Sequence, residues 1–356
     1  MKNPRAAVLS VLKVLIPLGI IVYLLLTHVT PSQWQTLATH PKNYPLLCVA
    51  LLVALGAISL SLTRWCLLVR CQGIELTMLE AHRLGAICFL LNFVAAGSVG
   101  GDLFKAIFLA KRRPGKRVEA FASVVVDRGV GLYGLLVIAT IAFLVHGGGS
   151  SALGGDARMQ QLQYLSAAFL GLGTVVLVIL VFGGRAVDRV VTRSAGLPVV
   201  GGVITRIGQP LRMFHDHPVA FAISILMSVG VHALLTVSIY LIAKSLYPSV
   251  PSFAEHCIIV PAGMLASALP LTPAGIGLLE AAIEWLYQVI PAQPTLASGT
   301  LVALVFELVK LIIAIVGTVF YWTANQEVID SLEGDEPSTR ESLPDSRQDR
   351  DAFAAG

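Results

Sequence analysis

The stretch Asn92-Phe-Val-Ala-Ala-Gly-Ser-Val-Gly-Gly-Asp-Leu-Phe-Lys105 interrupts a long apolar region with three glycines, a serine and an Asp/Lys pair. Glycine costs about 1 kcal/mol relative to alanine inside a helix, and a charge at bilayer depth costs about 2.5 kcal/mol or more. A regular membrane-crossing helix does not have this composition. We therefore expect the helix to break here, with the broken backbone facing protein or water.

Composition places the chain among helical membrane proteins. It has 356 residues, of which 56% are hydrophobic and 13% charged, and its mean hydropathy is +0.79. Soluble globular domains are much more charged than this. Apolar segments of helical length recur, whereas the alternating ten-residue segments of membrane barrels do not. We predict an all-α, polytopic membrane domain over residues 1–323.

Six apolar segments are long enough to cross roughly 30 Å of hydrocarbon at about 1.5 Å per residue. They cover residues 6–28, 44–68, 118–145, 162–182, 218–243 and 297–323. Two further apolar regions, 83–113 and 253–290, are each split in the middle by glycine or proline. Each half has roughly 12 to 16 residues, which reaches the middle of a membrane but is short for a full crossing.

Basic residues predict which connections face the cytoplasm. They are concentrated at Lys2 and Arg5, in the turn with Arg70 and Arg83, in residues 111–117 and in residues 183–217. Residues 147–161 and the segments near Pro248 and Pro291 carry almost no charge. The positive-inside rule therefore predicts that the basic segments and both termini are cytoplasmic.

The same charges predict how the two split regions are inserted. Region 83–113 begins and ends beside basic segments, which indicates a re-entrant hairpin that enters and leaves at the cytoplasmic face. Region 253–290 then enters and leaves at the opposite face. The resulting order predicts an inverted repeat, with one repeat at about 6–145 and the other at about 162–323. A fold with eight to ten full crossings is the alternative.

The two ends of the chain and the cysteines add no predicted cofactor or metal site. Residues 6–26 follow two basic residues as in a signal peptide, but no small-residue cleavage site follows, so we interpret them as the first span. Residues 324–356 carry nine Asp/Glu against three Arg, which predicts an acidic, disordered cytoplasmic tail. The five cysteines have no metal or redox spacing and are interpreted as packing residues.

The tip of the first hairpin is rich in glycine and carries both signs of charge. Its residues are Gly97, Ser98, Gly100, Gly101, Asp102 and Lys105. Glycines let backbone N–H groups point at a ligand, and the half-helix that begins near Asp102 directs the positive end of its dipole there. Such a tip can hold a phosphate or a carboxylate. Alternatively, Asp102 simply caps the half-helix.

The tip of the second hairpin contains Pro270, Pro273, Gly275 and Gly277 within eight residues. This composition is incompatible with a regular helix. Glu280 and Glu284 follow one turn apart on one helical face. The paired carboxylates can bind a proton, a cation or a basic group of a substrate. In the alternative interpretation, Glu280 only interacts with the dipole of its half-helix.

The spans that follow the two hairpins contain charges of their own. Asp127 and Arg128 lie about ten residues into the span 118–145, near the expected bilayer centre. Glu307 and Lys310 lie at a similar depth in the last span, at a spacing that lets them pair. Charges at this depth are candidate binding residues, although a buried pair can serve only to hold two helices together.

Three weaker features have structural explanations beside functional ones. His232 lies inside a span and is interpreted as a hydrogen-bonded packing residue rather than a proton relay. Arg64 is predicted to lie at the cytoplasmic boundary, contacting lipid phosphates or fixing topology. Residues 129–134 match G-x-G-x-x-G but no strand precedes them, so we interpret these small residues as a helix-packing surface and not as a dinucleotide site.

Two sequence blocks resemble the signatures of the lysylphosphatidylglycerol synthase transmembrane region family, a group of flippase-like membrane proteins. The first runs from Gly100-Gly101-Asp102 through Lys105 and a basic loop to Ser123 and Asp127-Arg128-Gly129, and the second runs from Pro270 to Glu280. The resemblance extends from about residue 8 to residue 323. It implies a membrane domain that moves lipids between leaflets, without the soluble aminoacyl transferase domain of larger relatives.

The chain also departs from the family pattern at three positions. Ala274 replaces a usual glycine, Lys105 a common arginine, and Glu307 lies where an arginine is usual. The last difference bears on the charge of the substrate.

Together these features predict a lipid translocator of a bacterial-type inner membrane. We expect it to be no enzyme and to bind anionic or aminoacylated membrane lipids, with a proton or cation as a coupling ion and no nucleic acid. A membrane-embedded enzyme acting on a lipid-linked substrate and a small-solute secondary transporter are the alternatives.

Overall fold

The computed structural model describes residues 30–94, 100–113, 115–147, 157–184, 193, 213–268, 272, 277–291 and 293–322. Over these residues the chain is helical with short turns, and none of them forms a strand. The predicted all-α class is therefore confirmed. The predicted first span at 6–28 and the predicted tail at 324–356 lie outside the described residues.

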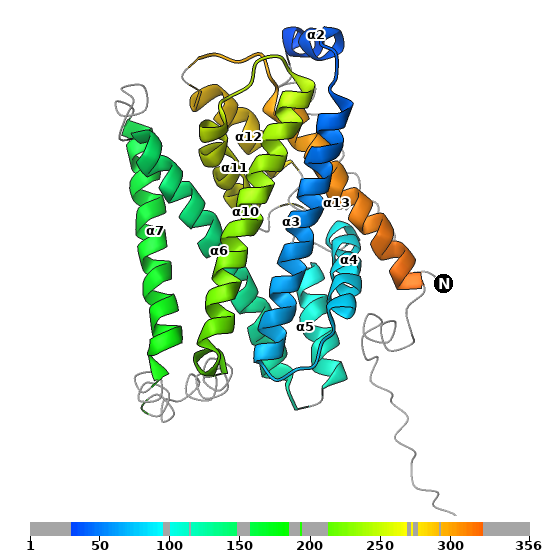
Figure 1. Cartoon of the computed structure of the whole chain (residues 1–356), viewed down its shortest axis with the longest axis vertical. Helices are drawn as coiled ribbons and strands as arrows, with labels where there is room; N and C mark the ends of the chain where they lie inside the picture. The colour runs from blue at the N-terminus through cyan, green and yellow to red at the C-terminus, as the bar shows by residue number, and fades with distance from the viewer. Residues whose placement is uncertain are drawn as a thin grey trace, which may run out of the picture.

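Ten helices are described, and Figure 1 shows them as an elongated bundle. They are α2 (Pro31–Thr39), α3 (Tyr44–Cys71), α4 (Met78–Val94), α5 (Gly100–Arg112), α6 (Arg117–Gly147), α7 (Ala157–Phe182), α10 (Pro218–Leu246), α11 (Phe253–Ser267), α12 (Leu278–Val289) and α13 (Gly299–Trp322). Four of them, α3, α6, α10 and α13, are long and apolar enough to cross a membrane. The apolar stretch of α7, Gln163–Ile179, belongs to a shorter class of 10–17 residues.

The helices α4 and α5 form the first hairpin, at the end of the bundle where α3 finishes (Figure 1). They have 17 and 13 residues, too few for a comfortable crossing. Near the open end of the hairpin, Arg112 of α5 pairs with Glu80 of α4 at 2.7 Å, and Arg113 pairs with Glu75 at 2.7 Å. The chain therefore enters and leaves this hairpin at one end of the bundle.

The helices α11 and α12 form the second hairpin at the other end of the bundle (Figure 1). His256 in the first turn of α11 lies 2.8 Å from the Tyr287 hydroxyl near the end of α12. The backbone N–H of Asn43, just before α3, donates to the Ser245 carbonyl at the end of α10 at 3.1 Å. The second hairpin therefore starts where α3 starts. The two hairpins are inserted from opposite ends, while the inverted repeat itself stays a prediction.

The local sequence explains where the two helices of the second hairpin, α11 and α12, begin. Ser252 and Glu255 form a capping box at the start of α11, with the Ser252 hydroxyl accepting from the Glu255 N–H at 3.2 Å and a Glu255 carboxylate oxygen accepting from the Ser252 N–H at 2.6 Å. Gly277, immediately before α12, has φ 90°, a conformation that L side chains rarely adopt. Gly277 thus supplies the backbone conformation from which α12 starts.

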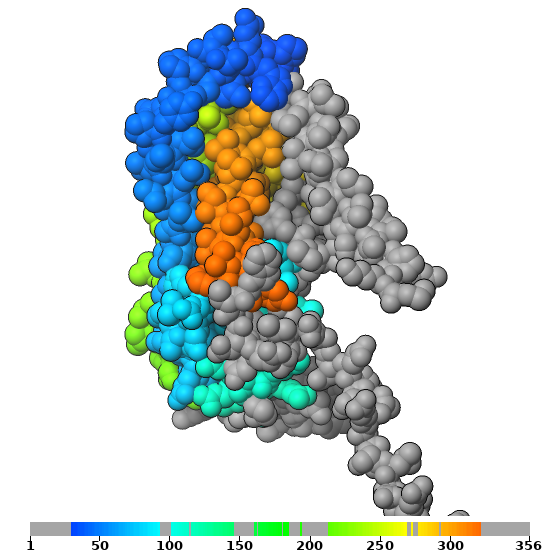
Figure 2. Space-filling model, turned by 90° about the vertical axis from the view of Figure 1, so that its right-hand side faces the viewer, coloured from blue at the N-terminus to red at the C-terminus, as the bar shows by residue number. Residues whose placement is uncertain are grey.

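Helix α13 joins the two halves of the molecule by packing against α12 near its start and against α4 further along. Figure 2 shows it lying beside α3 on one face, with its far end next to the first hairpin and α2 over the end of the bundle. At the α13 and α4 contact, a Cβ on Gly317 would lie 2.1 Å from the Ala86 carbonyl oxygen. The two backbones therefore touch, and a glycine is required there.

The outer surface of α7 is apolar. Its exposed large side chains are Tyr164, Leu165, Phe169, Leu172, Val175, Val176, Val178, Ile179 and Phe182. A contiguous apolar surface of this kind is typical of contact with lipid hydrocarbon. Of the five cysteines, all are free, and Cys66, Cys71 and Cys88 are buried, which agrees with a packing role for these three.

Candidate functional site

The charges of the first hairpin and of α6 meet at Asp102. This residue lies in the first turn of α5, and its carboxylate accepts from Nε of Arg128 on α6. The Nζ atom of Lys105 lies 3.7 Å from the other carboxylate oxygen and 4.8 Å from the centre of the Trp65 ring. Asp102 therefore bridges two cations, which is more than the capping role that was the alternative interpretation.

Close packing of α5 against α4 fixes the position of Asp102 at the start of α5. The N–H of Gly101 donates to the side-chain oxygen of Asn92 at 2.8 Å. A Cβ on Gly101 would lie 2.6 Å from the Cys88 carbonyl oxygen, so no larger residue fits. Gly101 thus serves the packing of the hairpin, and Gly100 begins α5.

Asp127 pairs with Arg64 in the interior, between α6 and α3. Nε of Arg64 lies 2.9 Å from the Asp127 carboxylate, and Nη2 donates to the Asp127 carbonyl at 3.3 Å. The Arg64 side chain is 5% exposed and that of Asp127 12%. Arg64 therefore does not make the contact with lipid phosphates that was one of its two interpretations, because its side chain is buried against α6. Its depth relative to the membrane boundary stays a prediction.

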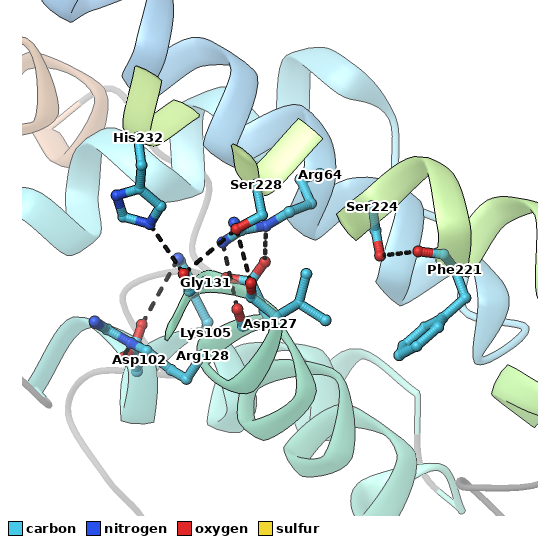
Figure 3. Close-up of polar contacts among 11 residues, drawn as sticks. Arg64, Asp102, Lys105, Asp127, Arg128, Gly131, Phe221, Ser224, Ser228 and His232 are labelled. Atoms are coloured by element: carbon cyan, nitrogen blue, oxygen red, sulfur yellow. Dashed lines mark hydrogen bonds and ion pairs between the residues drawn. The ribbon is translucent and has the colours of Figure 1, made fainter. Parts of the chain in front are cut away.

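Helix α10 packs on the same part of α6, as Figure 3 shows. His232 donates through Nε2 to the Gly131 carbonyl at 3.0 Å, and the Ser228 hydroxyl donates to the Val130 carbonyl at 2.7 Å. A Cβ on Gly134 would lie 2.3 Å from the Ser228 hydroxyl oxygen. The hydrogen bond expected of His232 is present, and Gly134 confirms the predicted helix-packing surface.

Glu280, at the start of α12, is fully buried. One carboxylate oxygen accepts from the Gly277 N–H at 2.7 Å, which is the helix-capping contact. The other oxygen, Oε1, is buried and has no hydrogen-bond partner among the described residues. The capping contact therefore engages one carboxylate oxygen of Glu280 and leaves the other oxygen able to accept a further hydrogen bond.

Glu284, one turn further on, is engaged by three donors. Its carboxylate accepts from the Gln33 side chain at 3.3 Å, from the Ser298 hydroxyl at 2.9 Å and from the Thr300 N–H at 2.7 Å. These contacts fasten α2, α12 and the start of α13 together. They supply a structural role for Glu284 that the spacing with Glu280 did not suggest.

Glu307 and Lys310 form the predicted pair on α13, with Nζ and Oε1 2.6 Å apart. Their side chains are 10% and 19% exposed. Oε2 of Glu307 is buried and has no hydrogen-bond partner in the described part of the chain. They lie on α13, which packs against α12, and their charges act on the carboxyl group of Glu280. Glu280, Glu307 and Lys310 thus form one charged cluster, which we call the α12/α13 cluster.

Four predicted site residues, Gly97, Ser98, Pro273 and Gly275, lie outside the described residues. Gly277 is described and gives α12 its start. Three further residues contact the site and were not predicted, since each is an ordinary residue in a helix: Asn92, Trp65 and Gln33. Among the described residues, no group of three His, Cys, Asp or Glu side chains could hold a metal ion.

We name the first set of charges the α5/α6 cluster. Its members are Arg64, Asp102, Lys105, Asp127 and Arg128. It contains three cations and two carboxylates, so one positive charge is uncompensated within it. Arg128 is the most accessible member of the cluster, with 54% of its side chain exposed. It nevertheless lies deep in the bundle, about 17 Å along α6 from Arg117, the first residue of that helix. The cluster can therefore attract an anionic group into the bundle.

Long apolar helices, two short hairpins inserted from opposite ends and charges buried between them define a multi-pass helical membrane protein. The chain belongs to the lysylphosphatidylglycerol synthase TM region family, whose model matches residues 10–317. Comparison with curated proteins found no relative. The resemblance inferred from residues 100–129 and 270–280 is confirmed by this match.

Proposed function

We propose that this protein moves a polar-headed membrane lipid from one leaflet to the other. The family to which the chain belongs is the membrane region of an enzyme named for a lipid, which supports a lipid as the transported molecule. The two hairpins bring polar groups into an apolar bundle from both ends, as expected of a protein that passes a polar head group across hydrocarbon.

The observation that carries the proposal is the position of Arg128. Asp102 holds its Nε, which orients the planar guanidinium group. The two terminal nitrogens make no hydrogen bond to the described residues, and the side chain is 54% exposed. The free edge formed by the two terminal N–H groups of a guanidinium matches the geometry of a phosphate. Arg128 is therefore proposed to bind the phosphate of the lipid head group.

The charge balance supports an anionic or aminoacylated lipid. The uncompensated positive charge of the α5/α6 cluster favours a phosphodiester, which carries one negative charge. Lys105 forms an ion pair with the same Asp102 carboxylate as Arg128, so it adds a second cation beside the phosphate. An aminoacylated lipid carries the same phosphodiester, and its amine would stay outside the α12/α13 cluster, where Glu280 is completely buried.

Replacing Arg128 with Gln is expected to slow the movement of anionic lipids at least about tenfold, because a charge-assisted hydrogen bond to phosphate contributes about 1.5–3 kcal/mol. The measurement uses the purified protein in liposomes, with fluorescent lipids that differ in head group. Arg113→Gln is the matched control, since Arg113 forms an exposed pair with Glu75 and is expected to leave the rate unchanged. The proposal fails if the unmodified protein moves no lipid, or if Arg128→Gln moves every lipid at the original rate.

We further propose that the protein lies in a bacterial-type inner membrane with the open end of the α4/α5 hairpin in the cytoplasm. Arg70, Arg112, Arg113 and Lys116 all lie at this end, and Lys116 donates to the Gln72 carbonyl at 3.0 Å across it. Lys and Arg are enriched in cytoplasmic connections.

In a variant lacking the five natural cysteines, we expect a cysteine at Arg113 to be labelled from the cytoplasmic side. A cysteine at Ser249, in the exposed connection between α10 and α11, is expected to be labelled only from the other side. An impermeant thiol reagent applied to intact cells and to inverted vesicles makes the measurement. Labelling of both positions from the same side would contradict the arrangement.

A further inference from the structure

Two buried carboxylate oxygens lack a hydrogen bond in the described interior, Oε1 of Glu280 and Oε2 of Glu307. The other three carboxylates predicted as site residues are engaged: Asp102 by Arg128 and Lys105, Asp127 by Arg64, and Glu284 by three donors. We propose that Glu280 and Glu307 together bind one proton, and that uptake and release of this proton accompany the movement of lipid.

The charge of the α12/α13 cluster favours a bound proton. If both carboxyl groups are ionised, Lys310 compensates only one of them, and a net negative charge remains buried. Burying an uncompensated carboxylate costs several kcal/mol, and such a group normally becomes neutral by taking up a proton. One proton on either carboxyl group makes the cluster neutral.

Within the described part of the chain, no other charged group packed against α12 supplies the missing positive charge. On α12 itself, Glu284 is directed to Gln33, Ser298 and Thr300. On α11, Glu255 and His256 lie in the first turn, where they contact Ser252 and Tyr287 near the far end of α12. On α13, Glu307 and Lys310 are the charged residues that act on Glu280. The balance is therefore determined by Glu280, Glu307 and Lys310.

A proton fits this cluster better than a larger ligand does. Glu280 is completely buried and Glu307 is 9% exposed, which leaves little access for an amine or a hydrated cation. The described residues also lack the third acidic or imidazole ligand that a metal ion would need. A proton from the aqueous phase needs only one oxygen, where it forms an O–H bond and turns an unpartnered acceptor into a donor.

The position of the cluster links the proton to the hairpins. Glu280 belongs to the second hairpin, whereas Glu307 and Lys310 belong to α13, which also packs against α4 of the first hairpin. When the proton is bound, α12 and α13 can stay together. When it leaves, two carboxylates repel each other across this contact. Protonation can therefore bias how the two hairpins are placed, and this last step rests on the proposed lipid movement.

Infrared spectroscopy of the protein in liposomes tests the proton site directly. The carbonyl stretching band of a protonated carboxylic acid is expected in the unmodified protein near neutral pH. Glu280→Gln and Glu307→Gln are each expected to abolish it, because Lys310 then neutralises the remaining carboxylate. Glu284→Gln is the matched control and is expected to retain the band.

Both test substitutions preserve the contacts that hold the helices. A Gln at position 280 still accepts from the Gly277 N–H, and a Gln at position 307 still accepts from Lys310. A folded, monodisperse variant is therefore expected in each case. If the band is missing from the unmodified protein, or if it persists in either of the two variants, the shared proton site is wrong.

Coupling to lipid movement is tested separately, with a pH gradient across the liposome. The unmodified protein is expected to move lipid several-fold faster in one direction of the gradient than in the other, and Glu280→Gln is expected to make the two rates equal. Lipid movement that ignores the gradient would overturn the coupling. Absence of any lipid movement would overturn the proposed function, whereas the infrared result on the proton site would still stand.

Discussion

Asp127→Leu is expected to destabilise the protein by about 3–5 kcal/mol, the range found when one partner of a buried ion pair is removed. The substitution leaves the buried Arg64 without its carboxylate, which lies 2.9 Å from Nε in the native protein. It also leaves Lys105, Arg128 and Arg64 facing only Asp102, so the uncompensated charge of the α5/α6 cluster doubles. Arg64→Met is expected to cost a similar amount, because it leaves Asp127 alone.

The double variant Arg64→Met/Asp127→Leu decides whether the pair acts through its charges. Replacing both partners with apolar residues of similar size is often neutral, so this variant is expected to recover most of the lost stability. Unfolding in detergent, followed by circular dichroism, measures all three variants. Arg113→Gln removes an exposed pair and serves as the control that should change little. Single variants as stable as the native protein would show that the pair is not essential to the fold.

The main features of the fold could be predicted because they follow from local energetics. Glycines and charges within residues 92–105 are incompatible with a membrane-crossing helix, and α4 does end at Val94 and α5 begin at Gly100. The proline and glycine pairs in residues 270–277 interrupt the second apolar region in the same way, between α11 and α12. Basic residues also predicted correctly that the two ends of the first hairpin lie together.

The partners of the buried charges could not be predicted, because a charge in a span reveals its depth and not the neighbour it faces. Arg64 and Asp127 are 63 positions apart, and their contact depends on how α3 and α6 are rotated. Glu280 and Glu284 have the spacing of one helical face, yet Glu280 lies near Glu307 while Glu284 contacts Ser298 and Thr300. A short helix meets different neighbours along its length, so periodicity alone does not define its contacts.

The structure separates charges that hold helices together from charges that retain an open bonding capacity. Asp127 and Glu284 are engaged by protein groups and support the packing, as is Arg64 through Nε and Nη2, although its buried Nη1 has no partner among the described residues. Arg128 has unengaged guanidinium nitrogens, and the α12/α13 cluster has two unpartnered oxygens. Hydrogen bonds that are incomplete in a buried region are costly, so they point to a ligand or a proton more strongly than the presence of a charge does.

Gly317→Ala is expected to destabilise the protein by about 2 kcal/mol, because the new methyl group would overlap a neighbouring backbone. Its Cβ would lie 2.1 Å from the Ala86 carbonyl oxygen and 2.5 Å from the carbonyl carbon. A flexible side chain could turn away, but a backbone carbonyl inside α4 can move only with its helix. The substitution therefore has to push α13 away from the first hairpin. Lower thermal stability in detergent is the measurement that checks this.

Gly56→Ala is the matched control, and it is not expected to destabilise the protein. Gly56 lies inside α3, and a Cβ there would have nothing within 4 Å. Alanine is a better helix former than glycine by about 1 kcal/mol, so this substitution should be neutral or stabilising. If Gly317→Ala were stabilising as well, helix propensity would outweigh the contact between α13 and α4. The contact between α13 and the first hairpin would then be too loose for protonation of the α12/α13 cluster to affect how the two hairpins are placed.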